Sequence, residues 1–341
     1  MPAMKMNVNY LGLPLESPFI AGASPMGGDL AVLKRLEDAG AGAVVLPSLF
    51  EEEIKQRQAE TITSLNNSPA FGEAQSFFTE PPMLHYGPDT YLEHIRKAKA
   101  AIGIPVIASL NGTSDDSWVN YARQIEQAGA DALEINLNIF ATNPDEGGVI
   151  ILQRLLSIIR HVRAGCRLPI AVKISPQFTS IASLAKQMEA AGAKGVVLFN
   201  RFFQPEIDIE KLTINRKLTL STPDELGLRL GWLGILSGNG TELSLSVSGG
   251  VHTGEDVIRS IMSGADTVQL VSVLLRKGPE HIGFLKAGVA RWMEEHEYAS
   301  LDAMRGCMNL AHCPDPSAYL RVNYMNMLHG WNYDPSMQTN D

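Results

Sequence analysis

One short phrase recurs four times along the chain, and each copy joins a helix pattern to a strand pattern. The copies are DAGAGAVVL at 38–46, QAGADALEI at 127–135, AAGAKGVVL at 190–198 and MSGADTVQL at 262–270. In each copy the helical pattern stops at a small residue and a glycine, where a left-handed C-terminal cap costs least, and a strand-like run follows directly. A chain that repeats this joint is built from helix–strand units.

Four further apolar runs of strand length lie between these joints, namely PFIAGAS, IPVIASL, PIAVKIS and LSLSVSGG. Together the patterns predict eight strands, near residues 18–23, 43–47, 104–110, 131–137, 169–175, 195–200, 243–248 and 266–271. Helices are expected near residues 29–39, 88–102, 115–128, 147–163, 179–191, 224–237, 254–263 and 278–296. Strands that are apolar on both faces and alternate with helices indicate a parallel sheet covered by helices.

Eight such units without a break in composition favour a closed (β/α)8 TIM barrel over a doubly wound sheet of about six strands. The chain has 341 residues, whereas a bare barrel needs about 250. We assign the excess to long active-site loops at 48–87 and 201–223 and to a C-terminal helical extension. The expected organisation is a single domain over residues 1–341, with 297–341 as a C-terminal cap.

The composition excludes several classes of protein. With 28 basic and 37 acidic side chains, a net charge of −9, the chain lacks the basic surface of a nucleic-acid-binding protein. We expect no membrane segment and no signal peptide, because no apolar run approaches the roughly 20 residues of a span. Three scattered cysteines indicate a cytoplasmic protein. Cys307, His312 and Cys313 lack a fourth ligand at zinc spacing, so we predict no metal site.

Polar side chains are expected at the carboxyl ends of the strands, where barrel enzymes place their active sites. Asn111, Asn136 and Asn200 end three strands, and Lys173 closes the apolar run PIAVKISP. A lysine in so apolar a strand needs an anion or a polar cofactor, because burying an unpaired charge is costly. These four side chains predict one polar pocket.

A phosphate site is expected on the other side of the barrel mouth. Gly249–Gly250 follow the seventh strand and precede a helix start capped by Thr253, and Ser272 follows the eighth strand. Backbone amides after strands 7 and 8 form the usual phosphate site of a barrel. A phosphate opposite a lysine favours FMN, because a cation near flavin N1 and the C2 carbonyl stabilises the reduced ring.

Five segments resemble, in order, the flavin-binding motifs of dihydroorotate dehydrogenases. They are SPFIAGAS, EINLN, AVKISP, VSGGVHTGEDV and ADTVQLVSVLLRKGP, and the resemblance spans roughly residues 9–305. It implies an FMN-containing barrel that oxidises dihydroorotate to orotate in pyrimidine biosynthesis. The family's flavin contacts fall on Gly22, Ala23, Ser24, Ser48, Asn111, Asn136, Lys173, Asn200, Gly249, Gly250, Val271 and Ser272. Val271–Ser272 stand where the family usually has Gly-Thr.

The proton-transfer site departs from the family pattern. After EINLN the family has a Cys or Ser base, whereas this chain has Ile139, which cannot accept a proton. The family's substrate loop is replaced by TEPPMLHYGPDTY at 79–91, where His85 or Tyr86 could exchange the proton instead. We therefore predict Lys173, Asn136, Asn200 and His85 as the catalytic set.

Two other functions fit the same residues. Lys173 could form a Schiff base in a barrel lyase, or the chain could bind flavin without catalysis. As partners we expect a small anionic substrate, a second copy of the chain in a homodimer, and a redox partner protein. Arg201 could bind a carboxylate of the substrate, or form a loop salt bridge with Glu206 or Asp208.

Overall fold

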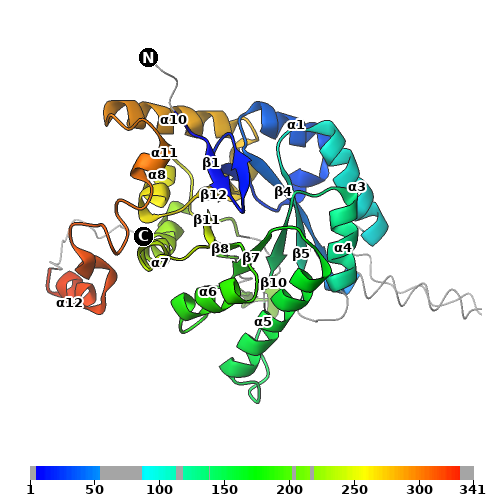
Figure 1. Ribbon diagram of the computed structural model, residues 1–341. Helices are drawn as coiled ribbons and strands as arrows, with labels where there is room; N and C mark the ends of the chain where they lie inside the picture. Colours follow the sequence, from blue (N-terminus) through cyan, green and yellow to red (C-terminus); the bar gives the residue numbers. More distant parts are fainter. Residues whose placement is uncertain are drawn as a thin grey trace, which may run out of the picture.

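The structure, a computed structural model, describes residues 5–53, 87–112, 118–137, 139–201, 205–215 and 219–330. Eight parallel strands close into a barrel in the order β11, β12, β3, β4, β5, β6, β7, β8 (Figure 1). Their bounds are β3 (Phe19–Ala21), β4 (Ala43–Phe50), β5 (Val106–Asn111), β6 (Ala132–Asn136), β7 (Ile170–Ile174), β8 (Gly195–Leu198), β11 (Ser244–Ser248) and β12 (Thr267–Leu270). The predicted (β/α)8 barrel is confirmed, and the doubly wound sheet is excluded.

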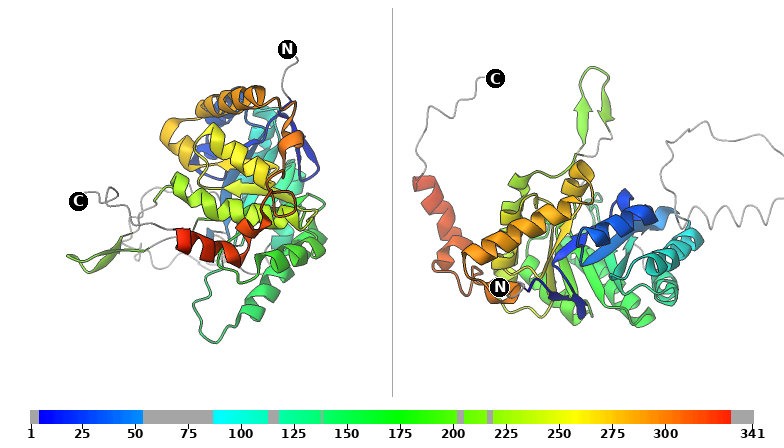
Figure 2. Two further views of the ribbon diagram at one scale, coloured as in Figure 1. Left: turned by 90° about the vertical axis from the view of Figure 1, so that its left-hand side faces the viewer. Right: turned by 90° about the horizontal axis from the view of Figure 1, so that it is seen from above.

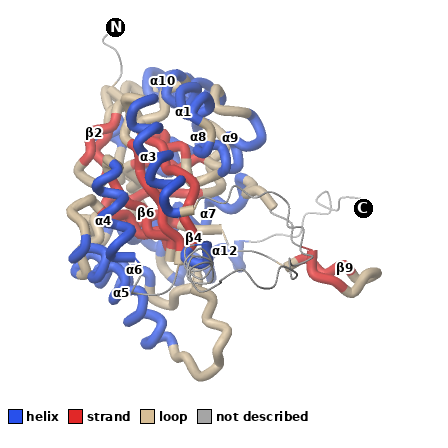
Figure 3. The backbone as a smooth tube through the Cα atoms, turned by 90° about the vertical axis from the view of Figure 1, so that its right-hand side faces the viewer, coloured by secondary structure: helices blue, strands red, loops and turns tan. Residues whose placement is uncertain are grey.

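Helices surround the barrel (Figure 3), and their buried side chains are mostly apolar. They are α1 (Leu30–Asp38), α3 (Pro88–Ala101), α4 (Trp118–Ala128), α5 (Gly148–Gly165), α6 (Ile181–Ala190), α7 (Leu226–Gly238), α8 (Gly254–Ser263), α9 (Ser272–Lys277) and α10 (His281–Glu295). In α1, for example, Leu33 and Leu36 are fully buried while the charged residues between them face outward. Burial of such apolar stripes against the sheet is the main stabilising contribution of each helix.

The helix expected at 278–296 is α10, and a separate short helix that the sequence patterns did not indicate, α9, precedes it. The chain breaks at Gly278, which has a φ of +86°, and Pro279 follows it. A left-handed glycine ends a helix and the proline after it cannot continue one. The consequence for function is that a helix begins at Ser272, directly after β12.

The four repeated joints have the backbone that their sequence predicts. Gly40, Gly129, Gly192 and Gly264 have φ angles of +96°, +94°, +105° and +117°. In each case the glycine ends a helix and the next barrel strand begins a few residues later. Only glycine adopts this conformation without steric cost.

An N-terminal hairpin, which the sequence patterns did not reveal, closes the amino end of the barrel. Its strands are β1 (Val8–Tyr10) and β2 (Leu13–Leu15). The Leu11 amide donates a hydrogen bond to Ser244 Oγ at 2.9 Å, and Tyr10 is fully buried. Since Ser244 is the first residue of β11, the hairpin lies under the barrel, opposite the predicted active site.

The loop after β8 and the C-terminal segment extend beyond the barrel (Figure 2). The loop contains a hairpin of β9 (Glu206–Asp208) and β10 (Thr213–Asn215) that projects from the molecule. The C-terminal segment contains α11 (Leu301–Met304), the 3-10 turn Pro316–Tyr319 and α12 (Arg321–Gly330). No residue of α12 is buried, so the predicted cap at 297–341 stays a prediction. In the described part of the chain, no helix is long and apolar enough to cross a membrane.

The left-handed joints should be sensitive to an added methyl group. An ideal Cβ at Gly129 meets nothing within 4 Å, so Gly129→Ala should lower the free energy of unfolding by about 1–2 kcal/mol through backbone strain alone. A Cβ at Gly264 lies 2.2 Å from Ser237 Cβ, so Gly264→Ala should cost more. Urea unfolding measures the free energy of unfolding of both variants. The control is Gly227→Ala inside α7, where φ is not left-handed and an ideal Cβ meets nothing within 4 Å, so it should not destabilise. Equal results for all three variants would contradict the strain argument.

Candidate functional site

The predicted polar residues on the central strands meet at the carboxyl end of the barrel. Asn111, Asn136 and Lys173 are in register on β5, β6 and β7. Residues in register on neighbouring strands point to the same side of a sheet. Asn200, two residues beyond β8, donates from Nδ2 to Asn136 Oδ1 at 2.8 Å, and its own amide donates to Ile174 O at 2.8 Å. The structure thus brings together these residues, which we predicted to share one pocket.

Below this group, Lys173 is part of a hydrogen-bonded network across the barrel interior. Its Nζ donates to Gln269 Oε1 at 3.0 Å and lies 3.7 Å from Glu134 Oε1. Gln269 Nε2 in turn donates to Glu134 Oε2 at 2.5 Å. Gln269 is on β12, on the opposite side of the barrel from β6 and β7, so the network spans the interior. Sequence reasoning identified Lys173 but missed both of its partners.

Burial makes this network a strong constraint. The side chains of Lys173 and Glu134 are 7% and 1% exposed, and Gln269 is 1% exposed. Removing one member of a buried ion pair typically costs about 3–5 kcal/mol, because the remaining charge is left without compensation. Below the network, burial and then the Glu134 charge raise the pKa of Tyr10 well above its usual value, so the phenol stays neutral.

The interior is polar on other strands as well. Ser48 on β4 and Ser109 on β5 are joined by a hydroxyl–hydroxyl hydrogen bond of 2.8 Å. Thr267 Oγ1 donates to Ser246 Oγ at 2.9 Å between β12 and β11. Barrel interiors are usually filled by branched apolar side chains. Ser48, one of the predicted cofactor contacts, therefore lies on the inner wall of a polar barrel.

The predicted phosphate residues lie close together at the ends of β11 and β12. Gly249 and Gly250 have φ angles of +87° and +82°. Ser221 donates from its amide and from its hydroxyl to Ser272 Oγ, both at 2.9 Å, and Gly250 donates to Ser221 Oγ at 3.3 Å. A Cβ at Gly250 would be 2.6 Å from the Leu226 amide nitrogen, so a side chain cannot fit there. Ser221 is a further member of this group of residues, and the sequence patterns did not indicate it.

A buried arginine lies directly behind this loop. Arg229 of α7 donates from Nε to Ser248 O at 2.5 Å and from one terminal nitrogen to Glu225 O at 2.6 Å. A Cβ at Gly249 would be 2.7 Å from its other terminal nitrogen. Burial lowers the pKa of Arg229, although the nearby Glu225 carboxylate opposes this effect. The expected backbone amides are thus supplemented by a fixed cation.

Two imidazoles with unpartnered nitrogens lie near the same loop. The Nε2 atoms of His252 and His281 are buried and have no hydrogen-bond partner among the described residues. Burial lowers the pKa of both side chains, the charge of Lys277 lowers both further, and the charge of Arg276 also lowers that of His252. Both imidazoles are therefore favoured in the neutral form. The predicted cap of the next helix is confirmed, because Thr253 Oγ1 accepts from the Asp256 amide at 3.2 Å.

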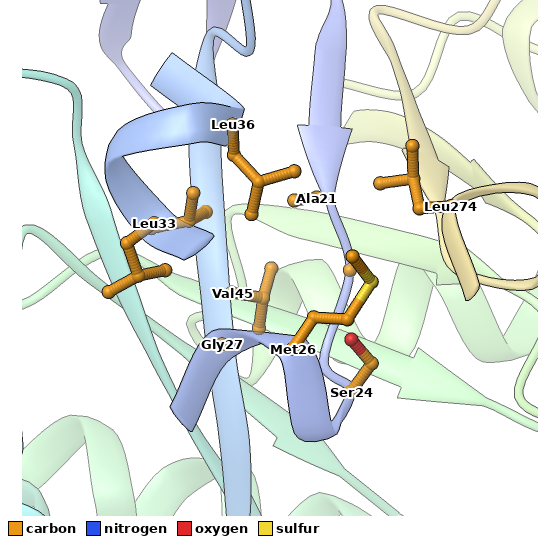
Figure 4. A pocket seen from close by; sticks show the side chains of 10 residues that line it. Ala21, Ser24, Met26, Gly27, Leu33, Leu36, Val45 and Leu274 are labelled. Carbon is orange, nitrogen blue, oxygen red and sulfur yellow. The ribbon is translucent and has the colours of Figure 1, made fainter. Parts of the chain in front are cut away.

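The end of β3 contributes the remaining predicted contacts. A Cβ at Gly22 would be 2.7 Å from Val271 Cγ2, so these two predicted cofactor residues are neighbours. Gly22 and Ser24 also line a small, mostly apolar pocket between β3, β4, α1 and α9 (Figure 4). Ala23, between them, is partly buried against the core. The apolar lining of this pocket suits packing rather than catalysis.

The departures from the family pattern are visible at the mouth of the barrel. Ile139 is partly buried against the hydrophobic core, and Phe140 after it is exposed. Arg201 pairs with Glu225, and the predicted pairing with Glu206 or Asp208 is wrong. The Arg201 amide donates to Asn200 Oδ1 at 3.0 Å, so Arg201 lies next to the asparagine pair. His85 lies outside the described residues.

Comparison with known proteins supports the resemblance to dihydroorotate dehydrogenases. A family profile described as "Dihydroorotate dehydrogenase" matches residues 83–293. The chain is 27% identical to the dihydroorotate dehydrogenase B (NAD(+)) catalytic subunit of Endomicrobium trichonymphae, covering 89% of this chain and 97% of that protein. It is 24% identical to the chloroplastic dihydropyrimidine dehydrogenase (NADP(+)) of Arabidopsis thaliana, covering 89% and 76%. It is 22% identical to the NAD-dependent dihydropyrimidine dehydrogenase subunit PreA of Escherichia coli, covering 89% and 77%.

Proposed function

Since the chain belongs to the dihydroorotate dehydrogenase family and is an FMN-dependent oxidoreductase acting on CH–CH groups, we propose that its substrate is a small anionic ring related to dihydroorotate. The observation that carries the proposal is the Asn136–Asn200 pair above the buried Lys173. Paired carboxamides offer both donors and acceptors, which a cyclic amide substrate requires.

The described residues fit FMN. Gly249 and Gly250 leave no room for a side chain, so their backbone amides are not screened by one, and Arg229 places a positive charge beside Gly249. Backbone amides backed by a cation suit a phosphate. The polar wall of Ser48, Asn111 and Lys173 suits the polar edge of a flavin ring. We propose that these residues, with Gly22, Ala23, Ser24, Val271 and Ser272, hold the cofactor.

Bound FMN would supply the hydride-accepting centre of the reaction. In the proposed mechanism the residues of the chain orient the reactants. Lys173 presents a positive charge to the cofactor, while Asn136 and Asn200 orient the substrate ring. Lys173 Nζ is occupied by Gln269 Oε1 and by the Glu134 carboxylate, whereas a Schiff-base nucleophile needs a free amine that faces the substrate. This argues against the lyase alternative.

Proton transfer needs a residue other than the one at the family's base position. Ile139 provides no proton acceptor, and losing a general base costs roughly 10²–10⁴-fold in rate. We propose that His85, in the segment after β4, takes this role. The proposal rests on its sequence position, because residues 54–86 are outside the described part of the chain.

The rim charges support an anionic substrate. Arg201 and Arg229 share the single carboxylate of Glu225, which leaves one net positive charge beside Asn200. Among the relatives, the dihydroorotate enzymes are named for a carboxylate-bearing ring and the dihydropyrimidine enzymes for a ring without that group. An uncompensated guanidinium near the mouth suits the former.

The relatives also suggest partners. Several are named as the catalytic subunit of a dihydroorotate dehydrogenase B, and PreA is named as a subunit. We propose that a redox partner protein reoxidises the flavin of this chain, and that two copies of the chain form a homodimer. A cytoplasmic location stays a prediction.

Anaerobic reduction tests the proposed function. The purified protein should bind FMN and be yellow, and dihydroorotate or a related reduced ring acid should bleach the flavin. Ile139→Cys should raise the rate with dihydroorotate by about 10²-fold or more, since it restores an acceptor at the base position, and His85→Gln should slow the native reaction. Bound FMN that no member of the substrate panel reduces would support the non-catalytic alternative and contradict the proposal. Failure to bind FMN at all would contradict the family assignment of the site.

Arg229 gives a separate test of the phosphate site. Arg229→Met should weaken FMN binding by about tenfold or more, equivalent to about 1.4 kcal/mol, because the cation behind Gly249 is lost. Riboflavin, which lacks the phosphate, should bind the variant and the wild type equally well, and this also checks that the variant is folded. The matched control is Arg96→Met on the outer face of α3. An equal loss for both ligands would show that Arg229 supports the fold rather than the phosphate.

A further inference from the structure

We propose that Glu134 and Gln269 are positioning residues that hold Lys173 charged and fixed in direction, and that they thereby set the reduction potential of the flavin. The inference rests on the proposed function, in which Lys173 faces the cofactor. Neither residue was a candidate in the sequence, where both look like ordinary members of barrel strands.

The first argument is the fixed orientation of Gln269. A lysine ammonium has only donors and a carboxylate has only acceptors. The Gln269 amide lies between them, so its oxygen must face Lys173 and its nitrogen must face Glu134, as the distances of 3.0 Å and 2.5 Å show. The amide therefore cannot turn over without breaking both hydrogen bonds. It separates Lys173 from Glu134 on one side and directs the ammonium on the other.

The second argument is the electrostatic effect of Glu134. A buried ammonium needs an opposite charge close by, because burying an unpaired charge is costly. Glu134 Oε1 supplies that charge, 3.7 Å from Lys173 Nζ in the buried interior. The same carboxylate also weakens the field that Lys173 projects toward the mouth of the barrel. Glu134 thus compensates the buried cation and limits its effect on the reduced ring.

The other groups near Lys173 and Glu134 are neutral or paired elsewhere, so this pair determines the local electrostatic field. From β1, Tyr10 faces the network as a neutral phenol, because burial raises its pKa. Asp266, at the base of β12, forms an ion pair with Arg305. The side chain in register with Lys173 on β8 is the apolar Val197, and on β6 it is the uncharged Asn136. Among the described residues, Lys173 forms its ion pair with Glu134.

The test measures the potential of bound FMN against pH in wild type and in Glu134→Gln. At mildly acidic pH, uncompensated Lys173 should favour reduced over oxidised FMN by at least tenfold relative to wild type, a shift of about 30 mV for a two-electron couple. Ser246→Ala, which removes another buried interior hydroxyl, is the matched control and should follow wild type.

Two further variants separate positioning from general damage. In a Lys173→Met background, Glu134→Gln should shift the potential by less than it does in the wild-type background, because Glu134 acts partly through Lys173. Gln269→Met removes the bridge without changing charge, so Lys173 should close onto Glu134 and the potential should fall at every pH. If Glu134→Gln does not fold, Gln269→Met decides the question alone.

The outcomes distinguish the two levels of inference. A wild-type chain that binds no FMN contradicts the proposed function. If the wild-type chain binds FMN but Glu134→Gln or Gln269→Met has the same flavin potential as wild type at every pH, only the positioning roles are contradicted.

Discussion

The buried network of Lys173, Gln269 and Glu134 is the constraint on which the site depends. It joins β7, β12 and β6 through the middle of the barrel, so the barrel must close in the observed register for the charges to be paired. An unpaired charge at this depth would cost several kcal/mol. The same requirement fixes where Lys173 points, and the asparagines of the mouth are placed around it.

An acidic chain that binds FMN needs positive charge near both the phosphate and the ring of the cofactor. The chain has a net charge of −9, yet its cofactor carries a phosphate and its reduced ring develops negative charge. In the proposed site, Lys173, paired with Glu134, would serve the ring. Arg229, beside Gly249 and paired with Glu225, would serve the phosphate. Two buried local cations would then take the place of a basic surface.

The sequence predicted the parts of the fold that local patterns determine. The glycine joints, the eight strands and the strand-end polar residues all follow from periodicity and cap chemistry. The hydrogen bonds of Gln269 did not, because Gln269 lies 96 residues from Lys173 and 135 residues from Glu134. The pairing of Arg201 with Glu225, 24 residues apart, was missed for the same reason. The N-terminal hairpin is a local feature whose short strands the patterns did not indicate. Contacts between distant segments depend on register and closure, which no single segment encodes.

The central claim is that Lys173 faces the flavin ring while its other side is held by Gln269 and Glu134. A crystal structure of the protein with bound FMN tests this most directly. We predict Lys173 Nζ at about 3 Å, hydrogen-bond distance, from N1 or the C2 carbonyl oxygen of the ring, with the bond to Gln269 kept and the phosphate on the amides of Gly249 and Gly250. A ring bound away from Lys173, or a lysine that has left Gln269, would contradict the claim.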